Sequence, residues 1–382
     1  MRRILVSLLI VVCVIFLLIQ VISRFSADTG TQNEGSVADT ISVPDNIRLV
    51  FVGDVMGHGN QIKGAWHDGG DSCYNFAPSF QGMKDYISSA DLAIANLEVT
   101  LAGAPYTGYP AFSSPRSLAV ALQDMGFDML VTANNHIMDK GKAGLESTIN
   151  TLDELGIPHT GAFKDSTAWK ANNPLIIEKN NFKLAFLSYT YGSNMAMPRS
   201  PQILNTIDTI RMAADLARAR ELTPDYIITC IHWGEEYQNK ENAMQRRIAA
   251  FLADNGCNLI VGAHPHAIQP IVKIAGNTVD SALVAYSLGN FISNQRWRYS
   301  DGGIALEVTL TKTDSTFAVS HDYESFWVHR YPAKEDVYLY RMILLKDYLN
   351  DMESYSAISE KDKSLMMQFC DDTKKIIEKA GP

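Results

Sequence analysis

The chain has 382 residues and a formal net charge of −9, with 46% hydrophobic and 20% charged residues. This balance is typical of a globular protein with a sizeable core. Lys and Arg never occur in runs longer than a pair, which argues against a nucleic-acid partner, because such proteins need a basic face to neutralise phosphates. The five cysteines are scattered without a Cys-x-x-Cys pair, so neither a zinc ribbon nor a disulfide framework is indicated.

The N-terminal segment predicts a membrane anchor. An almost unbroken apolar run, Ile4–Ile22, follows Arg2 and Arg3 and is long enough to span a bilayer as a helix. Its apolar core is longer than that of a usual cleaved signal peptide, which is the alternative. The preceding arginines favour a cytoplasmic N-terminus. We therefore expect a signal anchor over residues 1–26 that holds the rest of the chain outside the cell membrane, followed by a flexible polar linker over residues 27–46.

From Ile47 onward, short apolar runs alternate with segments of helical spacing. The predicted strands are Arg48–Val52, Leu92–Ala95, Met129–Val131, Pro174–Glu178, Lys183–Ser188, Tyr226–Ile231, Leu259–Val261, Ile268–Ile274, Leu283–Tyr286 and Ile304–Leu310. The predicted helices are Tyr74–Ser88, Pro115–Met125, Ala143–Leu155, Ile207–Leu222, Ala243–Asn255, Val337–Asn350 and Ser364–Lys379. This alternation predicts an α/β fold with mostly parallel strands over residues 47–330, and a helical C-terminal extension over residues 331–382.

Five of the predicted strands end in side chains that can bind metal ions. These are Asp54 with His58, Asn96 with Glu98, Asn134 to His136, His232, and His264 with His266. Ligands of α/β sheets bind beyond the carboxyl ends of the strands, so adjacent parallel strands would bring these side chains together. Carboxylate, amide and imidazole groups form the mixed set that a pair of divalent metals needs. A chance arrangement is the alternative, since turns after strands favour Asp, Asn and Gly.

The segment Leu259–Pro270 carries the densest part of this pattern. His264 and His266 are separated only by Pro265, which stiffens the chain. In an extended segment, residues two apart point to the same side, so we expect both imidazoles to face one centre. Such a pair suits Zn, Mn or Fe. A solvated loop is the alternative for this segment taken alone.

Six motifs together resemble the CapA family, which is implicated in capsule synthesis and named for the poly-γ-glutamate capsule. They are GDVM (Gly53–Met56), NLE (Asn96–Glu98), NNHIMDKG (Asn134–Gly141), HWGEEY (His232–Tyr237), GAHPH (Gly262–His266) and YSLGNF (Tyr286–Phe291). The family is in turn similar to the calcineurin-like metallophosphoesterases, whose fold is a four-layer α/β/β/α sandwich around a two-metal site. The resemblance runs from Ile47 to Thr311 and implies that fold here.

The resemblance also implies a role for each matching residue. The metal ligands would be Asp54, Glu98, Asn135, His232, His264 and His266. Glu98 would bridge two divalent ions, which would be Mn, Zn or Fe. His136 would assist the leaving group as an acid, and Asp139 would hold His136 in its orientation. His58, Asn96 and Asn290 are additional candidates.

Two positions depart from the phosphoesterase pattern. Met56 stands where those enzymes carry a histidine, and His58 is the candidate that could replace it. Glu98 stands where they carry an Asp, so its carboxylate reaches one methylene further. Both departures affect the first metal position more than the second.

These features lead to two hypotheses of function. The first is a metal-dependent hydrolase or transferase acting on a capsular or cell-envelope polymer, or on its phosphorylated intermediate. The second is a non-catalytic component of a capsule export or assembly complex, in contact with other membrane-bound capsule synthesis proteins. Arg296 and Arg298 could bind an anionic polymer through their guanidinium forks, although a solvated loop explains them equally well.

Overall fold

The structure is a computed structural model that describes residues 45–313 and 316–378. The predicted anchor and nearly all of the predicted linker lie outside these residues. Within the described ranges, none of the helices combines the length and the apolar character needed to cross a bilayer. The description below concerns the unit that begins at Pro44.

The first sheet has eight strands in the order β16-β15-β14-β1-β2-β3-β4, and β13 also pairs with β1. Their bounds are β1 (Asp45–Val55), β2 (Leu92–Leu97), β3 (Met129–Val131), β4 (His159–Thr160), β13 (Asn290–Ile292), β14 (Gly302–Lys312), β15 (Phe317–Lys334) and β16 (Val337–Leu344). Strands β1 to β4 run parallel, whereas β14, β15 and β16 are antiparallel to their neighbours.

The second sheet has six strands in the order β11-β12-β10-β9-β7-β6. Their bounds are β6 (Leu175–Lys179), β7 (Phe182–Thr190), β9 (Tyr226–His232), β10 (Leu259–Ala263), β11 (Ile271–Ile274) and β12 (Ala282–Ala285), and β5 (Ala162–Phe163) and β8 (Ile203–Leu204) form a separate pair. The predicted strands Pro174–Glu178 and Lys183–Ser188 correspond to β6 and β7, which form a hairpin. Its turn residues Asn180 and Asn181 have φ values of 51° and 63°, the left-handed geometry that a two-residue hairpin turn requires.

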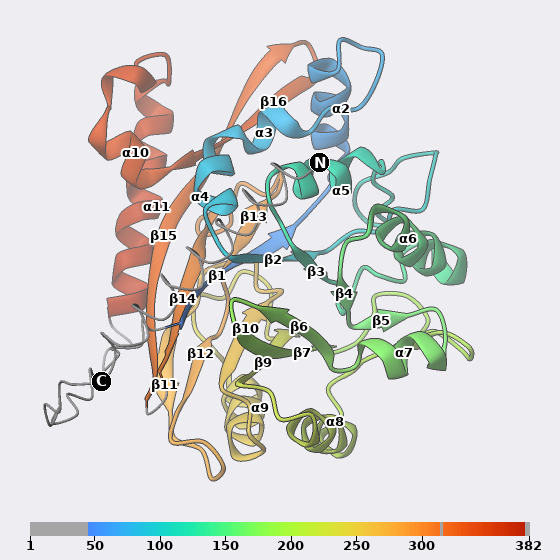
Figure 1. The fold of residues 1–382 in the computed structure, drawn as a ribbon. Helices are drawn as coiled ribbons and strands as arrows, with labels where there is room; N and C mark the ends of the chain where they lie inside the picture. The colour runs from blue at the N-terminus through green and yellow to red at the C-terminus, as the bar shows by residue number, and fades with distance from the viewer. Residues whose placement is uncertain (1–44, 314–315, 379–382) are drawn as a thin grey trace, which may run out of the picture. The chain divides into compact units, whose positions relative to one another are not determined.

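The two sheets pack face to face, and helices cover their outer faces (Figure 1). Leu49 of β1 shares a buried cluster with Phe186 of β7 and Ile228 of β9. The next β1 side chain, Val50, points the other way, because side chains alternate along a strand. It shares a cluster with Leu118 of the helix α5 (Ser117–Asp124). The mixed α/β class is therefore confirmed, and its layers follow the order α/β/β/α.

Most of the helices complete the outer layers, whereas the last two, which carry Tyr348 and Phe369, pack against the buried cluster between the sheets. Their bounds are α2 (Gly59–Asp68), α3 (Ala77–Phe80), α4 (Lys84–Ser88), α5 (Ser117–Asp124), α6 (Gly141–Leu155), α7 (Ser166–Asn172), α8 (Thr209–Glu221), α9 (Ala243–Asp254), α10 (Leu345–Asn350) and α11 (Glu360–Glu378). Helices α8 and α9 cover the second sheet, as Met212 and Ile248 show by their packing. Gly156 ends α6 with a φ of 66°, the left-handed conformation in which glycine commonly closes a helix.

Two predicted helices differ from the structure. The segment Tyr74–Ser88 forms two short helices, α3 and α4, joined by a 3-10 turn. The helix predicted over Val337–Asn350 is wrong for its first eight residues, which form β16, and only α10 is helical. The reason is tertiary: β16 pairs antiparallel along β15, a strand that the sequence pattern left unassigned, and its Val, Tyr and Ile residues favour a pleated strand. The extension over residues 331–382 is therefore only partly helical.

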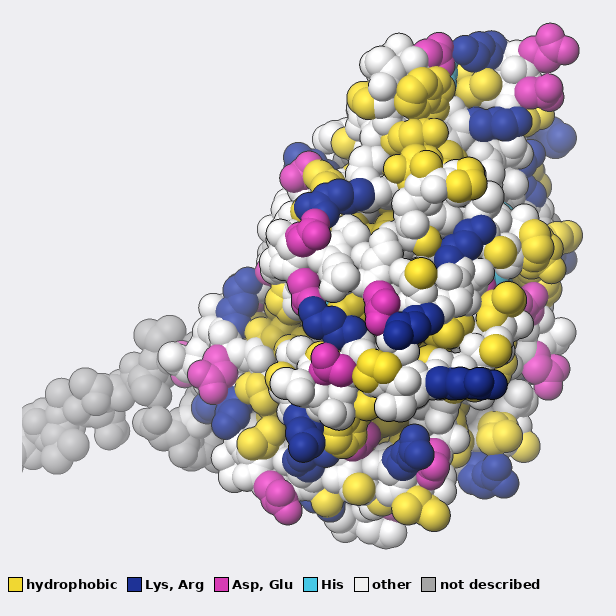
Figure 2. All heavy atoms as spheres, turned by 90° about the vertical axis from the view of Figure 1, so that its right-hand side faces the viewer, with side chains coloured by type: hydrophobic (Ala, Val, Ile, Leu, Met, Phe, Trp, Pro, Cys, Tyr) yellow, Lys and Arg dark blue, Asp and Glu magenta, His cyan; other side chains and the backbone are white. Residues whose placement is uncertain are grey.

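The surface carries charges of both signs. In Figure 2, Lys and Arg side chains are interspersed with Asp and Glu, and hydrophobic side chains lie between them. Several charged side chains of the surface form ion pairs, including Arg116 with Glu154 and Lys164 with Asp153, each at 2.6 Å. Exposed pairs of this kind contribute only about 0–1 kcal/mol to stability. They favour solubility more than they hold the fold together.

Candidate metal centre

The predicted metal-binding side chains meet where strands of both sheets end. Asp54 lies near the end of β1 and Glu98 directly follows β2, while His232 is the last residue of β9. Asn135 lies in the loop after β3, and His264 directly follows β10. All of these side chains are buried. Parallel strands of two facing sheets thus bring residues that are up to 210 positions apart into one site.

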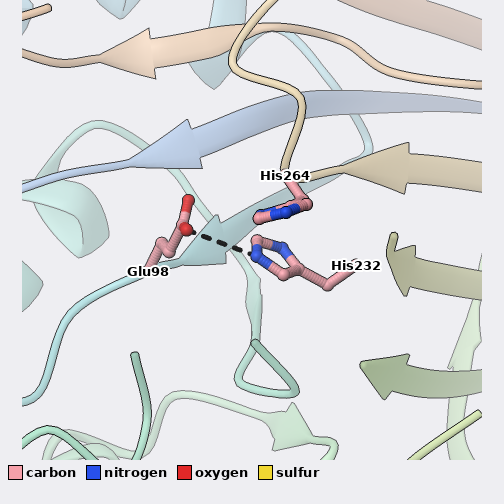
Figure 3. A group of neighbouring side chains, drawn as sticks. All are labelled: Glu98, His232 and His264. Atoms are coloured by element: carbon pink, nitrogen blue, oxygen red, sulfur yellow. Dashed lines mark ion pairs between the residues drawn. The ribbon is translucent and has the colours of Figure 1, made fainter. Parts of the chain in front are cut away.

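Five side chains of the kind that bind metal ions form two groups, and one residue belongs to both groups. Asp54, Glu98 and His266 form the first group, which we call the first metal position, and Glu98, His232 and His264 form the second metal position. The ligand atoms within each group lie within 4.8 Å of one another. Glu98 Oε1 lies 3.3 Å from His232 Nε2 (Figure 3), and Glu98 Oε2 lies 3.9 Å from His266 Nδ1. Glu98 is therefore placed between the two positions, where a bridging carboxylate would be needed.

The backbone at the histidine pair differs from the prediction. His264 and His266 have φ values of 98° and 54°, which are uncommon for residues other than glycine. The segment is therefore not extended, and the expectation that both rings face one centre is wrong. Each imidazole instead joins a different metal position, with the ring centroids 6.1 Å apart. Strained backbone of this kind is found where a site fixes its side chains.

Two asparagines connect the groups. Asn135 Oδ1 lies 2.9 Å from His232 Nε2, the ring nitrogen that Glu98 also approaches. Asn96 Nδ2 donates to Asp54 Oδ1 at 2.7 Å and lies 3.2 Å from His232 Nδ1. Asn135 thus contributes to the second position, whereas Asn96 lies between the two and supports Asp54 and His232.

Burial keeps the imidazoles of the second position neutral. It lowers the pKa of His232 well below its usual value and the pKa of His264 to about 3, and neighbouring imidazoles add to both effects. A neutral imidazole is the form that binds metals. Burial also raises the pKa of Glu98 well above its usual value, with the nearby Asp54 as the next cause. Burial acts in the same direction on Asp54, but the hydrogen bond and charge of His266 bring the pKa of Asp54 below its usual range.

The donor set fits divalent cations. Both carboxylate oxygens of Glu98 and the Nδ1 atom of His264 are buried without a hydrogen-bond partner among the described residues. Within the same ranges, the only ion pairs of Asp54 and Glu98 are with histidines, not with Lys or Arg. Two buried carboxylates without a cation are costly, and a divalent ion removes that cost. The residues present therefore fit a metal ion at each position.

His136 and Asp139 form a separate pair beside these positions. His136 Nδ1 lies 2.7 Å from Asp139 Oδ2, which also accepts the Phe112 N–H at 2.7 Å. The ring of Phe112 packs edge-on against the His136 ring at 4.7 Å. His136 Nε2 lies 3.4 Å from Asn194 Nδ2, a contact that the sequence did not suggest, because Asn194 lies in the loop after β7. Asp139 therefore orients His136 so that Nε2 faces away from the carboxylate.

Two residues near the first position do not join it. Met56 is 2% exposed and belongs to the hydrophobic core between the first sheet and its helices. His58 Nδ1 lies 3.0 Å from Gln61 Oε1 and accepts the Asn294 N–H at 3.4 Å. Burial lowers the pKa of His58 to about 4. The structure thus places neither side chain in a metal position, whereas Asn290 Oδ1 lies 3.0 Å from His266 Nδ1.

Aromatic side chains line the site. The ring of Tyr191 lies 4.7 Å from that of His264, and the ring of Tyr237 lies 6.0 Å from that of His266. Tyr237 in turn packs at 4.7 Å against Trp297, whose side chain is exposed. Tyr191 directly follows β7, so the rule that strand ends carry the site could have identified it. The prediction missed it because the expected strand ended at Ser188.

The two arginines considered for polymer binding already have partners. Arg296 donates to the Val328 carbonyl at 2.7 Å and to the Ser293 carbonyl at 3.3 Å. Arg298 forms a two-pronged ion pair with Asp372 of α11, at 2.9 and 2.8 Å. Their contacts hold the loop after β13 to the rest of the fold.

Comparisons with known proteins identify the family. The model of the family described as "Bacterial capsule synthesis protein PGA_cap" matches residues 48–295. The "Capsule biosynthesis protein CapA" of Bacillus anthracis is 26% identical over 268 residues, which cover 66% of this chain and 61% of that protein. The "PGA biosynthesis protein CapA" of Bacillus subtilis (strain 168) is 26% identical over 280 residues, covering 70% and 69%.

Among solved structures, the 5'-nucleotidase from Candida albicans SC5314 aligns with a TM-score of 0.41 at 14% identity, over 86% of this chain and 58% of that one. A score of this size does not establish a shared fold. The chain spans 61% of the length of the Bacillus anthracis relative, so the match describes part of that protein. The family model, in contrast, covers well over half of the 382 residues, as the six motifs predicted. The chain belongs to the bacterial capsule synthesis protein family PGA_cap.

Proposed function

We propose that this chain is a metal-dependent hydrolase or transferase with a metallophosphoesterase-like site that acts on a capsular or cell-envelope polymer, or on its phosphorylated intermediate. The observation that carries the proposal is the position of Glu98 between two groups of buried side chains that can bind metal ions. The family match and the relatives named for capsule and PGA biosynthesis support the polymer as the substrate class. The polymer and other capsule synthesis proteins are the expected partners.

The chemistry divides between the metal positions and His136. Two bound divalent ions would provide a water-derived nucleophile and offset negative charge on the substrate oxygens. Asp54, Glu98, Asn135 and the three site histidines would hold them. His136 Nε2 is the atom that would give a proton to the leaving group, while Asp139 keeps Nδ1 engaged. Tyr191 and Tyr237 would limit the access of bulk water and contact the substrate.

The proposal extends to the fold family and the location. Two facing sheets with helices on both outer faces support a sandwich of the calcineurin-like metallophosphoesterase type. The apolar run Ile4–Ile22 supports attachment to the cell membrane with the folded unit outside. A site on the outside of the cell membrane would have access to a capsular polymer.

A second candidate function is a non-catalytic part of a capsule export or assembly complex. Met56 favours it, because this buried methionine removes one ligand of the phosphoesterase pattern. The two functions differ in whether bonds of the polymer or of its intermediate are broken.

Hydrolysis by the full-length protein distinguishes them. The protein is loaded with Mn²⁺ and incubated with phosphate mono- and diesters and with γ-linked oligoglutamate, and release of phosphate, alcohol or glutamate is measured. We expect turnover of one of these classes that EDTA abolishes and fresh Mn²⁺ restores, because the buried carboxylates require the cation. If protein that is shown to hold metal turns over neither the phosphate esters nor the oligoglutamate, the result favours the assembly role.

A further inference from the structure

Asn290 lies beside Asp54 in the middle of the first sheet. Strand β13 pairs parallel with β1, and Asn290 is the residue opposite Asp54. The Asp54 N–H donates to the Gly289 carbonyl at 3.1 Å. A Cβ atom on Gly53 would lie 1.9 Å from that carbonyl oxygen, so this close approach requires the glycine. The fold therefore fixes the buried Asn290 next to the first metal position.

Hydrogen bonds determine which way the Asn290 amide faces. Its nitrogen Nδ2 donates to the Ser300 carbonyl at 2.8 Å and to Gln295 Oε1 at 2.9 Å. A backbone carbonyl only accepts, so the amide nitrogen must occupy that side. The oxygen Oδ1 is then directed at His266 Nδ1, 3.0 Å away.

The atoms around His266 Nδ1 are spaced like the ligands of a metal ion. Asp54 Oδ2 and Asn290 Oδ1 each lie 3.0 Å from His266 Nδ1, and Glu98 Oε2 lies 3.9 Å from it. An imidazole nitrogen carries at most one proton, so it cannot donate fully to both close oxygens. Ligands roughly 2.1 Å from one ion and at right angles to each other stand about 3 Å apart. This spacing and the chemistry of the atoms agree with a shared ion.

We propose that Asn290 Oδ1 is a ligand of the first metal position, in place of the histidine that Met56 replaces, and that this position selects Mn²⁺. The proposal rests on the two-metal site proposed above. Asp54, Glu98 and Asn290 supply oxygens and His266 supplies the single nitrogen, a set that suits Mn²⁺. The second position carries two imidazoles instead and suits Zn²⁺.

Diffraction from crystals of the full-length protein loaded with Mn²⁺ and Zn²⁺ tests the assignment without any variant. The anomalous signal of manganese should appear among Asp54, Glu98 and His266, with Asn290 Oδ1 within about 2.3 Å of it. Manganese at the second position would overturn the selectivity. Manganese at the first position with Asn290 Oδ1 more than about 3 Å away would show that Asn290 only accepts a hydrogen bond from His266.

Variants provide an independent test in solution. Asn290→Ala should weaken Mn²⁺ binding by at least about tenfold and leave Zn²⁺ binding unchanged. Asn205→Ala is the matched control, because Asn205 is also buried but bonds to Asn173 and Ser188 instead. If wild type and Asn290→Ala bind Mn²⁺ with equal affinity, the assignment of Asn290 as a ligand is overturned, but the proposed function is not. Wild-type protein that binds no metal refutes the proposed function as well.

Discussion

Replacing Glu98 by Gln is expected to reduce bound metal from two ions to at most one per chain and to lower turnover by at least about 100-fold. Glu98 is the one residue shared by both metal positions, and its carboxylate oxygens have no hydrogen-bond partner among the described residues. Gln keeps the size of the side chain but removes the negative charge that would hold both ions. Metal content by mass spectrometry and turnover under saturating Mn²⁺ measure the two effects.

The same substitution should have the opposite effect on the stability of metal-free protein. Without a cation, burial and the nearby Asp54 favour the protonated form of Glu98, and protonation costs free energy at neutral pH. Gln is neutral without this cost, so it should raise the free energy of unfolding by about 1–3 kcal/mol. Glu154→Gln is the control, since Glu154 pairs with Arg116 at the surface and should change stability little. A Glu98→Gln protein that binds two ions like wild type would rule out a bridging role.

Substitution of His136 by Ala is expected to lower kcat by about 10²–10⁴-fold while metal content stays at the wild-type value. His136 is held by Asp139 through Nδ1 and belongs to neither group of metal-type ligands. It would therefore move a proton and not hold an ion. Asp139→Asn should have a smaller effect of the same kind, because it removes the charge that orients the ring.

The leaving group separates this acid role from a structural one. If His136 donates a proton, substrates with an activated leaving group such as nitrophenolate need little protonation, so the His136→Ala defect should shrink with them. An equal defect on activated and unactivated substrates, or loss of metal from the variant, would contradict the acid role. Thermal unfolding of the variant, followed in parallel, reports whether the fold has been damaged.

The layered α/β core was predictable because two features of the sequence indicate its strands. Runs such as Tyr226–Ile231 are apolar enough to be buried, and this run is followed directly by the polar side chain of His232. The carboxyl ends of parallel strands lie at the same edge of a sheet, so the strand order brings such side chains together. The structure places Asp54, Glu98, Asn135, His232, His264 and His266 in one site by this route.

Features that depend on tertiary contacts could not be predicted from the sequence in this way. Strand β16 has residues that suit either a helix or a strand, and only pairing with β15 decides. The left-handed backbone at His264 and His266 is rare enough for non-glycine residues that an extended segment was the natural expectation. Asn290 follows a glycine and is typical of a turn, and its position opposite Asp54 emerges only from the sheet register.

The most direct test of the two-metal account is the number of ions that the full-length wild-type protein retains after reconstitution with Mn²⁺ and Zn²⁺, measured by mass spectrometry beside His264→Ala. The account predicts two ions per chain in wild type and no more than one in the variant, which loses an imidazole of the second position. Wild-type protein that retains one ion or none would contradict it.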